Sequence, residues 1–257
     1  MTLQPILVFD FDGVIVDGLL EYWSSSRQAC LQMLEGNHNF KLPHDIPNAF
    51  KQIRPWVNHG WEMVLLAAEL MDLNSSLVIN GAKSFTDEYK KNCDNALSKW
   101  GWNPQELQKS LDNVRQQALK DNKEKWLASH KAFSGVVDRL NCLKDENIAF
   151  AILTTKSAAF TSELLIHLNL HPTLLYGYES GTKSEVLFHI SKEHLIKGFI
   201  EDRRVTLETI LNTPGINSIP CYLANWGYLK PNDSINLPSG IHLLKTKTLM
   251  SPLANWP

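Results

Sequence analysis

The feature that most constrains this chain is the stretch ILVFDFDGVIVDG at residues 6–18. An apolar run with the pattern of a buried strand ends directly in Asp10 and Asp12, and Gly13 and Asp17 follow closely. Carboxylates this close repel one another, so the arrangement costs stability unless a cation or a shared proton relieves the repulsion. The stretch therefore predicts a strand that presents a charged site at its carboxyl end.

The composition argues against several classes of partner. The 257 residues carry a formal charge of -2, and the Lys and Arg residues are scattered, so nothing favours nucleic acid or a membrane surface. No run approaches the roughly 18 apolar residues of a membrane span, and the first residues do not resemble a cleavable leader. The four cysteines form no C-x-x-C pair and are expected to be free thiols. We therefore expect a cytoplasmic protein with a small-molecule partner and no obligate protein partner.

Short apolar runs alternate with amphipathic segments over most of the chain. Five runs have the pattern of buried strands, and they lie at 5–10, 148–154, 173–178, 197–202 and 218–224. From about residue 131 onward the alternation is typical of βα units on a parallel sheet. Short, right-handed connections then favour a doubly wound, Rossmann-like α/β fold.

Residues 19–130 interrupt this alternation because they contain almost no strand-like run. They contain several helical patterns instead, one of which has Asn103 as its N-cap and Pro104 at its first position. The first strand therefore belongs with the later ones, and an all-helical module is inserted after it. The predicted domains are an α/β core of residues 1–18 and 131–257 and a helical insert of residues 19–130.

Polar side chains follow the predicted strands at the edge where open α/β sheets bind ligands. Asp10 and Asp12 follow the first strand, and Asp17 is expected either to join the same site or to cap the turn into the insert. The polar residues that follow later strands are Thr154, Thr155, Lys183, Glu201 and Asp202. The sequence thus predicts that four strand ends converge on one site.

This set of groups is what phosphoryl transfer needs. The Asp10 carboxylate can attack phosphorus and form an aspartyl phosphate, while Asp12 can protonate the leaving oxygen and later take a proton from water. A magnesium ion would hold the nucleophile against the phosphate, with acid oxygens and a backbone carbonyl as its ligands. Thr154, the Lys183 ammonium and the amides that open the following helix would bind the phosphoryl oxygens.

The motifs and their order resemble the haloacid dehalogenase-like (HAD) superfamily. DFDGVIVD resembles the first motif of that superfamily, AILTT the second, Lys183 the third and FIED the fourth. The insert resembles a C1-type cap, and ANWGYLKPND at 224–233 resembles a late segment of phosphoglycolate phosphatase-like members. The resemblance covers the whole chain. Within the superfamily, an acid at Asp12 implies a phosphatase or a phosphomutase.

The resemblance implies a HAD fold with a helical cap and a phosphatase acting on a small phosphorylated metabolite, first of all a phosphoglycolate-like ester. The predicted catalytic residues are Asp10, Asp12, Thr154 and Lys183. The predicted ligands of Mg²⁺ are Asp10, Asp12, Glu201 and Asp202. The predicted substrate and phosphate contacts are Gly13, Thr155 and Arg54.

Other interpretations fit these residues less well or stay open. A calcium loop also begins D-x-D-G, but Val14 and Ile15 stand where it needs an acid and a glycine. GYESGTKS resembles a P-loop, but Thr182 occupies the place of the second glycine. The fourth motif is irregular, because Thr206 and Leu207 follow where a further Asp is usual. Two alternatives to a phosphatase remain: a sugar phosphomutase, and a non-catalytic phosphate-binding descendant, which the irregular motif favours.

Overall fold

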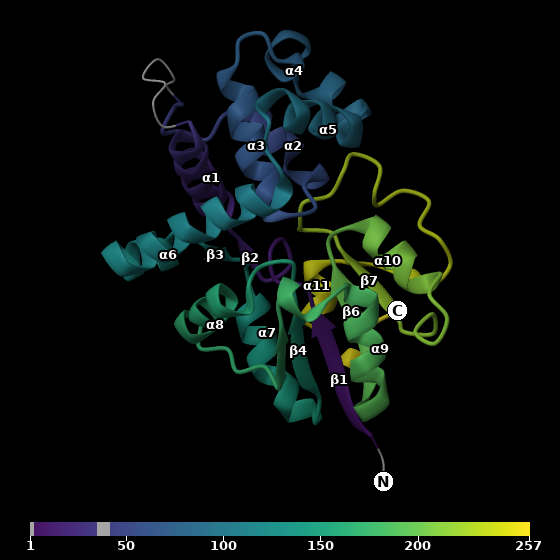
Figure 1. The fold of residues 1–257 in the computed structure, drawn as a ribbon. Helices are drawn as coiled ribbons and strands as arrows, with labels where there is room; N and C mark the ends of the chain where they lie inside the picture. Colours follow the sequence, from purple (N-terminus) through teal and green to yellow (C-terminus); the bar gives the residue numbers. More distant parts are fainter. Residues whose placement is uncertain (1–2, 35–41) are drawn as a thin grey trace. The chain divides into compact units, whose positions relative to one another are not determined.

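The computed structural model of the protein describes residues 3–34 and 42–257. The chain divides into two compact units, residues 1–17 together with 131–257, and residues 18–130 (Figure 1). We refer to them as the α/β unit and the helical unit. The role of the helical unit as a cap stays a prediction.

A six-stranded sheet organises the α/β unit, with its strands in the order β5-β4-β1-β6-β7-β8. The strands are β1 (Gln4–Phe9), β4 (Ala149–Leu153), β5 (Leu174–Tyr176), β6 (His194–Glu201), β7 (Cys221–Ala224) and β8 (Ile241–Leu244). Every pairing between neighbours is parallel. The predicted Rossmann-like parallel sheet is therefore confirmed, and its first strand in sequence lies at its centre.

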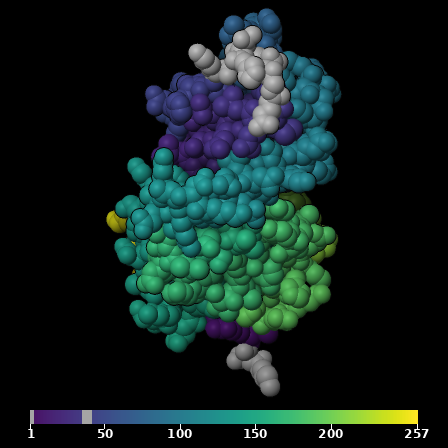
Figure 2. Space-filling model, turned by 60° about the vertical axis from the view of Figure 1, so that its left-hand side comes forward, coloured from purple at the N-terminus to yellow at the C-terminus, as the bar shows by residue number. Residues whose placement is uncertain are grey.

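Helices and connecting segments cover this sheet. The α-helices of the unit are α7 (Val136–Cys142), α8 (Ala158–His167), α9 (Lys183–Glu193), α10 (Arg204–Leu211) and α11 (Thr246–Leu249). Its 3-10 helices are η2 (Leu143–Glu146), η3 (Tyr178–Ser180) and η4 (Leu253–Asn255). In the space-filling view, one side of the α/β unit is a continuous teal and green surface, and the start of β1 emerges below it in purple (Figure 2).

The central strand is buried on both faces, which is typical of parallel sheets. Alternate side chains of β1 point to opposite faces. Ile6 and Val8 belong to an apolar cluster that includes side chains of α9 and α10, whereas Leu7 and Phe9 are buried on the other face. A strand in this position needs an unbroken apolar run, and Asp10 is the first residue beyond its end.

Three short strands of the α/β unit are absent from the sequence prediction. β8 has only four residues, and β2 (Val16–Asp17) and β3 (Lys131–Ala132) have two each. β2 and β3 pair as an antiparallel ribbon at the two points where the chain enters and leaves the helical unit. Segments this short show no periodicity that separates a strand from a loop.

The described part of the helical unit has helices as its regular elements. They are α1 (Leu19–Met33), α2 (Asn48–Ile53), η1 (Arg54–Trp56), α3 (Gly60–Met71), α4 (Ser76–Asp87), α5 (Tyr89–Trp100) and α6 (Pro104–Ala128). The predicted N-cap Asn103 is confirmed, because its side-chain oxygen accepts the N–H of Glu106 at 2.9 Å. Within residues 3–34 and 42–257, no helix has both the length and the apolar character that a membrane crossing requires.

The helical unit buries one ion pair between α1 and α6. Arg115 donates two hydrogen bonds to the carboxylate of Glu21, at 2.9 and 3.0 Å, and Ser25 donates a third at 2.6 Å. Both charged side chains are almost fully buried. A bidentate guanidinium matches the charge and the geometry of the carboxylate, so this buried acid is neutralised locally.

Candidate active site

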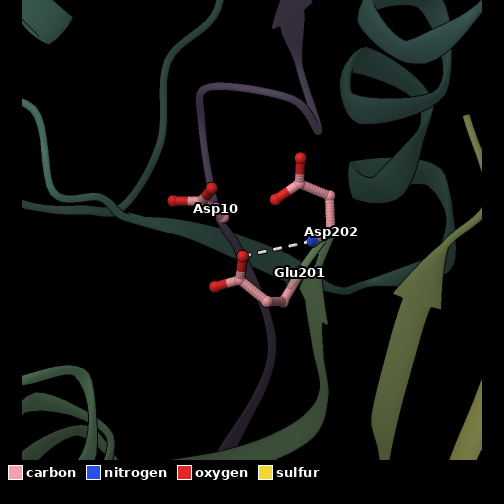
Figure 3. A group of neighbouring side chains, drawn as sticks. All are labelled: Asp10, Glu201 and Asp202. Carbon is pink, nitrogen blue, oxygen red and sulfur yellow. Dashed lines mark hydrogen bonds between the residues drawn. The ribbon is translucent and has the colours of Figure 1, made fainter. Parts of the chain in front are cut away.

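Three buried carboxylates meet at the carboxyl ends of β1 and β6. Asp10 follows β1, Glu201 is the last residue of β6, and Asp202 comes next. One oxygen from each of the three lies within 4.8 Å of the others, and Figure 3 shows the three side chains grouped around the two strand ends. β1 and β6 are neighbouring parallel strands, and the N–H of Asp10 donates to the carbonyl of Ile200 at 2.8 Å. The register of the sheet therefore brings the acids together.

Lys183, the first residue of α9, binds two of these acids. Its Nζ donates to Oδ1 of Asp10 at 2.7 Å and to Oε2 of Glu201 at 2.6 Å. A capping box fixes the first turn of α9, because the side chains of Thr182 and Glu185 each accept the other's backbone N–H. The ammonium is thus held in place, and it contributes one positive charge to three carboxylates.

The pKa values of the cluster show where the charge is uncompensated. Burial raises the pKa of Asp10 from 3.8 to about 7, the Lys183 ammonium opposes this rise, and Glu201 adds to it. Burial acts to lower the pKa of Lys183, but the two carboxylates outweigh burial and raise it. Burial acts to raise the pKa of Glu201, but Lys183, the Arg203 charge and the hydrogen bond from Asp202 together outweigh burial and lower it. Asp10 is therefore the acid of the pair whose charged form is disfavoured.

Both carboxylate oxygens of Glu201 are already hydrogen-bonded. Oε2 accepts from Lys183, and Oε1 accepts the backbone N–H groups of Asp202 at 3.2 Å and Arg203 at 3.1 Å. Figure 3 shows the bond between Glu201 and Asp202. The residue is fully buried. These contacts favour a positioning role for Glu201, which holds the Lys183 ammonium beside Asp10. Its role as a metal ligand stays a prediction.

Glycines allow the close approach of Asp202 to the loop of residues 10–15 between β1 and β2, which we call the first loop. Oδ2 of Asp202 accepts the N–H of Tyr228 at 2.8 Å. A Cβ atom on Gly13 would lie 2.0 Å from that oxygen, and one on Gly227 would lie 2.4 Å from Cβ of Asp202. The N–H of Gly13 donates to the carbonyl of Val16 at 2.8 Å. Packing therefore accounts for Gly13, whose contact with phosphate stays a prediction.

The segment after β4 brings a second cation to the site. Thr154 is buried, and its Oγ1 accepts the N–H of Lys156 at 3.1 Å, whereas Thr155 is exposed. Nζ of Lys156 lies 3.4 Å from Oδ2 of Asp12. Asp12 thus faces a cation of its own and lies outside the group of three acids. The sequence analysis missed Lys156, although its place in TTKS, two residues after Thr154, is a usable signal.

The segment after β7 forms hydrogen bonds with the first loop, with β2 and with the residue that follows β6. Nε1 of Trp226 donates to the carbonyl of Val14 at 3.0 Å, and the hydroxyl of Tyr228 donates to Oδ1 of Asp17 at 2.5 Å. The third contact is the hydrogen bond from the backbone N–H of Tyr228 to Asp202. Asp17 therefore accepts a phenol, a partner that sequence reasoning did not consider.

Arg54 belongs to the helical unit, where it begins η1. Its guanidinium carbon lies 5.0 Å from the centre of the Tyr22 ring, a distance typical of a cation–π contact. The predicted contact of Arg54 with substrate stays a prediction.

The three acids could bind a hard divalent cation. Magnesium and calcium prefer oxygen ligands, and carboxylates are the usual ones. Within the described residues, Asp10, Glu201 and Asp202 are the only group of three or more acidic, His or Cys side chains close enough to share an ion. Burial, and to a smaller extent the neighbouring Glu201, raise the pKa of Asp10, and a bound cation would favour its charged form. The donor chemistry of this group therefore fits a divalent cation, and its identity as Mg²⁺ stays a prediction.

Comparisons with known proteins identify the fold. No family model matches the sequence, and no curated protein does. Among solved structures, a predicted phosphatase from Clostridium acetobutylicum is 16% identical, with a TM-score of 0.60 over 97% of both chains. A haloacid dehalogenase-like family hydrolase from Streptococcus pneumoniae is 18% identical, with a TM-score of 0.53 over 96% of this chain and 95% of that one. A Thermotoga maritima protein, provisionally described as a β-phosphoglucomutase, is 15% identical, with a TM-score of 0.54 over 96% and 97%.

These similarities extend over nearly the whole chain and establish its fold. The protein has the fold of haloacid dehalogenase-like proteins, as the motif resemblance implied. A shared fold leaves the reaction open, so function has to be argued from the residues of the site.

Proposed function

We propose that this protein is a magnesium-dependent phosphatase that hydrolyses a small phosphorylated metabolite through an aspartyl-phosphate intermediate. The observation that carries the proposal is the buried group of Asp10, Glu201 and Asp202, with Lys183 bonded to two of its members. Surplus buried negative charge is costly in a purely structural cluster. It suits a site that binds a cation together with a phosphate ester, and the HAD fold supports the same class of chemistry.

In the first step, a carboxylate oxygen of Asp10 attacks phosphorus. The bond between phosphorus and the ester oxygen breaks, and its electron pair leaves with that oxygen. Asp12 gives its proton to the leaving oxygen, so the products are an aspartyl phosphate at Asp10, a free alcohol and the Asp12 carboxylate.

In the second step, water attacks the phosphorus of the aspartyl phosphate. Asp12 takes a proton from this water, and the bond between phosphorus and the Asp10 oxygen breaks. Inorganic phosphate is released, and both aspartates return to their starting states. Water therefore supplies the oxygen that replaces the substrate alcohol.

Other groups bind the phosphoryl oxygens and balance their charge. Lys183 and the hydroxyl of Thr154 follow strand ends of the sheet, where they can donate hydrogen bonds to these oxygens. Asp10 and Asp202 would hold Mg²⁺ together with a backbone carbonyl. Bound there, the ion supplies positive charge between the anionic nucleophile and the anionic phosphate.

The test is phosphate release with Mg²⁺ across a panel of phosphorylated acids, sugars and nucleotides. Phosphoglycolate is the first substrate, and the Asp10→Asn protein is the blank. We expect turnover of at least one compound that the blank does not turn over. If no compound releases phosphate above the blank, the phosphatase proposal fails, and a non-catalytic phosphate-binding protein becomes the better explanation.

A phosphomutase is the second candidate, favoured by the fold shared with the Thermotoga maritima protein. In that reaction a hydroxyl of a sugar phosphate, in place of water, accepts the phosphoryl group from Asp10. A bisphosphate that accumulates in the first turnover, with little free phosphate, would identify the mutase.

A further inference from the structure

Lys156 is a buried lysine that the steps above do not use. Its side chain is 2% exposed, and its Nζ lies 3.4 Å from Oδ2 of Asp12, whose side chain is 15% exposed. Burying an ammonium group is costly unless a carboxylate compensates its charge. The ion pair with Asp12 is therefore a specific feature of the site.

The backbone around Lys156 is held on both sides. Its N–H donates to Oγ1 of Thr154 at 3.1 Å, and its carbonyl accepts the N–H of Tyr178 at 3.2 Å. A Cβ atom on Gly177 would lie 2.9 Å from the same carbonyl oxygen, so η3 packs closely against this segment. The position from which the lysine side chain reaches Asp12 is thus fixed by its neighbours.

The hydrogen-bonding chemistry of lysine then distinguishes the two oxygens of Asp12. An ammonium group has three donors and no acceptor. The oxygen that faces it, Oδ2, can accept a hydrogen bond from Lys156, but it cannot at the same time carry a proton directed at that nitrogen. In the acid form of Asp12, the proton is therefore favoured on Oδ1, because the unprotonated oxygen of a carboxyl group is the stronger acceptor for the ammonium.

We propose that Lys156 is a positioning residue that fixes the carboxyl group of Asp12 and leaves Oδ1 as the atom that gives and takes the proton. This inference rests on the proposed phosphatase function. Lys183 has a different task, because it contacts Asp10 and Glu201. Lys183 thus contacts the nucleophile, Asp10, whereas Lys156 contacts the acid, Asp12.

The test measures phosphoenzyme formation in single-turnover quench-flow with two substrates. One is p-nitrophenyl phosphate, whose leaving group departs without a proton, and the other is the alkyl phosphate that the wild type turns over best. The variants are Lys156→Met, Lys156→Arg, Asp12→Asn and the Lys156→Met/Asp12→Asn double variant. Lys183→Met is the matched control, because it removes the other buried ammonium. Lys156→Gln replaces Lys156→Met if the methionine protein does not fold by circular dichroism.

We expect Lys156→Met to slow the reaction with the alkyl phosphate by about tenfold to a hundredfold, which is part of the roughly 10²–10⁴-fold that general acid catalysis contributes. With p-nitrophenyl phosphate it should have little effect. It should add no loss in the Asp12→Asn background, and Lys156→Arg should recover part of the rate. Lys183→Met should slow both substrates alike.

Two results would overturn the inference while leaving the phosphatase intact. Equal slowing of both substrates that also adds to the effect of Asp12→Asn would assign Lys156 a structural role. A weaker affinity for both substrates with unchanged rates would make it a phosphate ligand. If the wild type forms no phosphoenzyme from either substrate, the proposed function itself fails, and the inference fails with it.

Discussion

The two units each bury acidic side chains, but they balance the charge differently. In the helical unit, Glu21 receives two hydrogen bonds from Arg115 and one from Ser25, so the guanidinium matches this acid in charge and geometry. Nε2 of His130 lies 3.7 Å from the same carboxylate. In the α/β unit, three carboxylates gather around a strand end, and Lys183 contacts two of them. The comparison teaches that burial of an acid does not by itself indicate a functional site. Charge that the protein leaves unbalanced is the better indicator.

Removing the cation from each cluster is the strongest test of whether the two clusters differ in charge balance. Lys183→Met and Arg115→Met should each lower the free energy of unfolding by about 3–5 kcal/mol, because each leaves a buried carboxylate without its partner. Millimolar Mg²⁺ should restore part of the loss in Lys183→Met, since the ion supplies the missing charge. It should restore none in Arg115→Met. Urea unfolding with and without Mg²⁺ measures both effects, and equal rescue of the two variants would contradict the distinction.

Glycine substitutions compare a crowded position with an open one. Gly13 has a φ of +92°, and an added Cβ would meet Asp202. Gly101, which follows α5 in the helical unit, has a φ of +66° with nothing near its added Cβ. Gly101→Ala should cost about 1 kcal/mol from backbone strain, and Gly13→Ala about 2–4 kcal/mol from strain and overpacking. Thermal unfolding measures the difference. If the two substitutions lower the free energy of unfolding by similar amounts, the first loop can move to accommodate the added methyl group.

Sequence reasoning reached the fold, and it placed several of the candidate residues at strand ends, because both follow from local rules. An apolar run that ends at Phe9 places Asp10 at a strand end, and parallel neighbours bring their ends to one edge of the sheet. Contacts between distant segments follow no such rule. Tyr228 lies 26 residues beyond the carboxylate that it binds, and Lys183 lies 18 residues before Glu201, whose Oε2 it contacts. The short strand β8 was missed for the same reason, because pairing with β7 defines it.

Magnesium should stabilise the α/β unit through its acids and leave the neutralised pair of the helical unit unaffected. At about a hundredfold excess over its Kd, Mg²⁺ should raise the free energy of unfolding by about 2–3 kcal/mol. Asp202→Asn should abolish this increment, because it removes a predicted ligand. The control, Glu21→Gln, should keep it, whatever it does to stability without the ion. Calorimetry at several Mg²⁺ concentrations measures the increment, and its survival in Asp202→Asn would place the ion elsewhere.

The most gradual expected effect is a dependence of stability on pH, which the acids around Asp10 should produce. Burial raises the pKa of Asp10 from 3.8 to about 7. Between these values the folded protein without Mg²⁺ holds a proton that the unfolded chain has released, so its stability should rise as pH falls from about 7 to about 5. The contribution of Asp10 is about 1.4 kcal/mol per pH unit at most. Glu201 does not disturb this window, because its lowered pKa confines its contribution to pH values below 4.5.

The control for this effect is Asp10→Asn, which removes the titrating group and keeps its shape. Urea unfolding in a chelator at several pH values should show a shallower slope for Asp10→Asn than for the wild type, because the variant lacks the carboxyl group that takes up the proton. Adding Mg²⁺ to the wild type should flatten the slope as well, since a cation held by the carboxylate competes with the proton. Parallel slopes for the two proteins would mean that Lys183 balances Asp10 as fully as Arg115 balances Glu21. The contrast between the two clusters would then be lost.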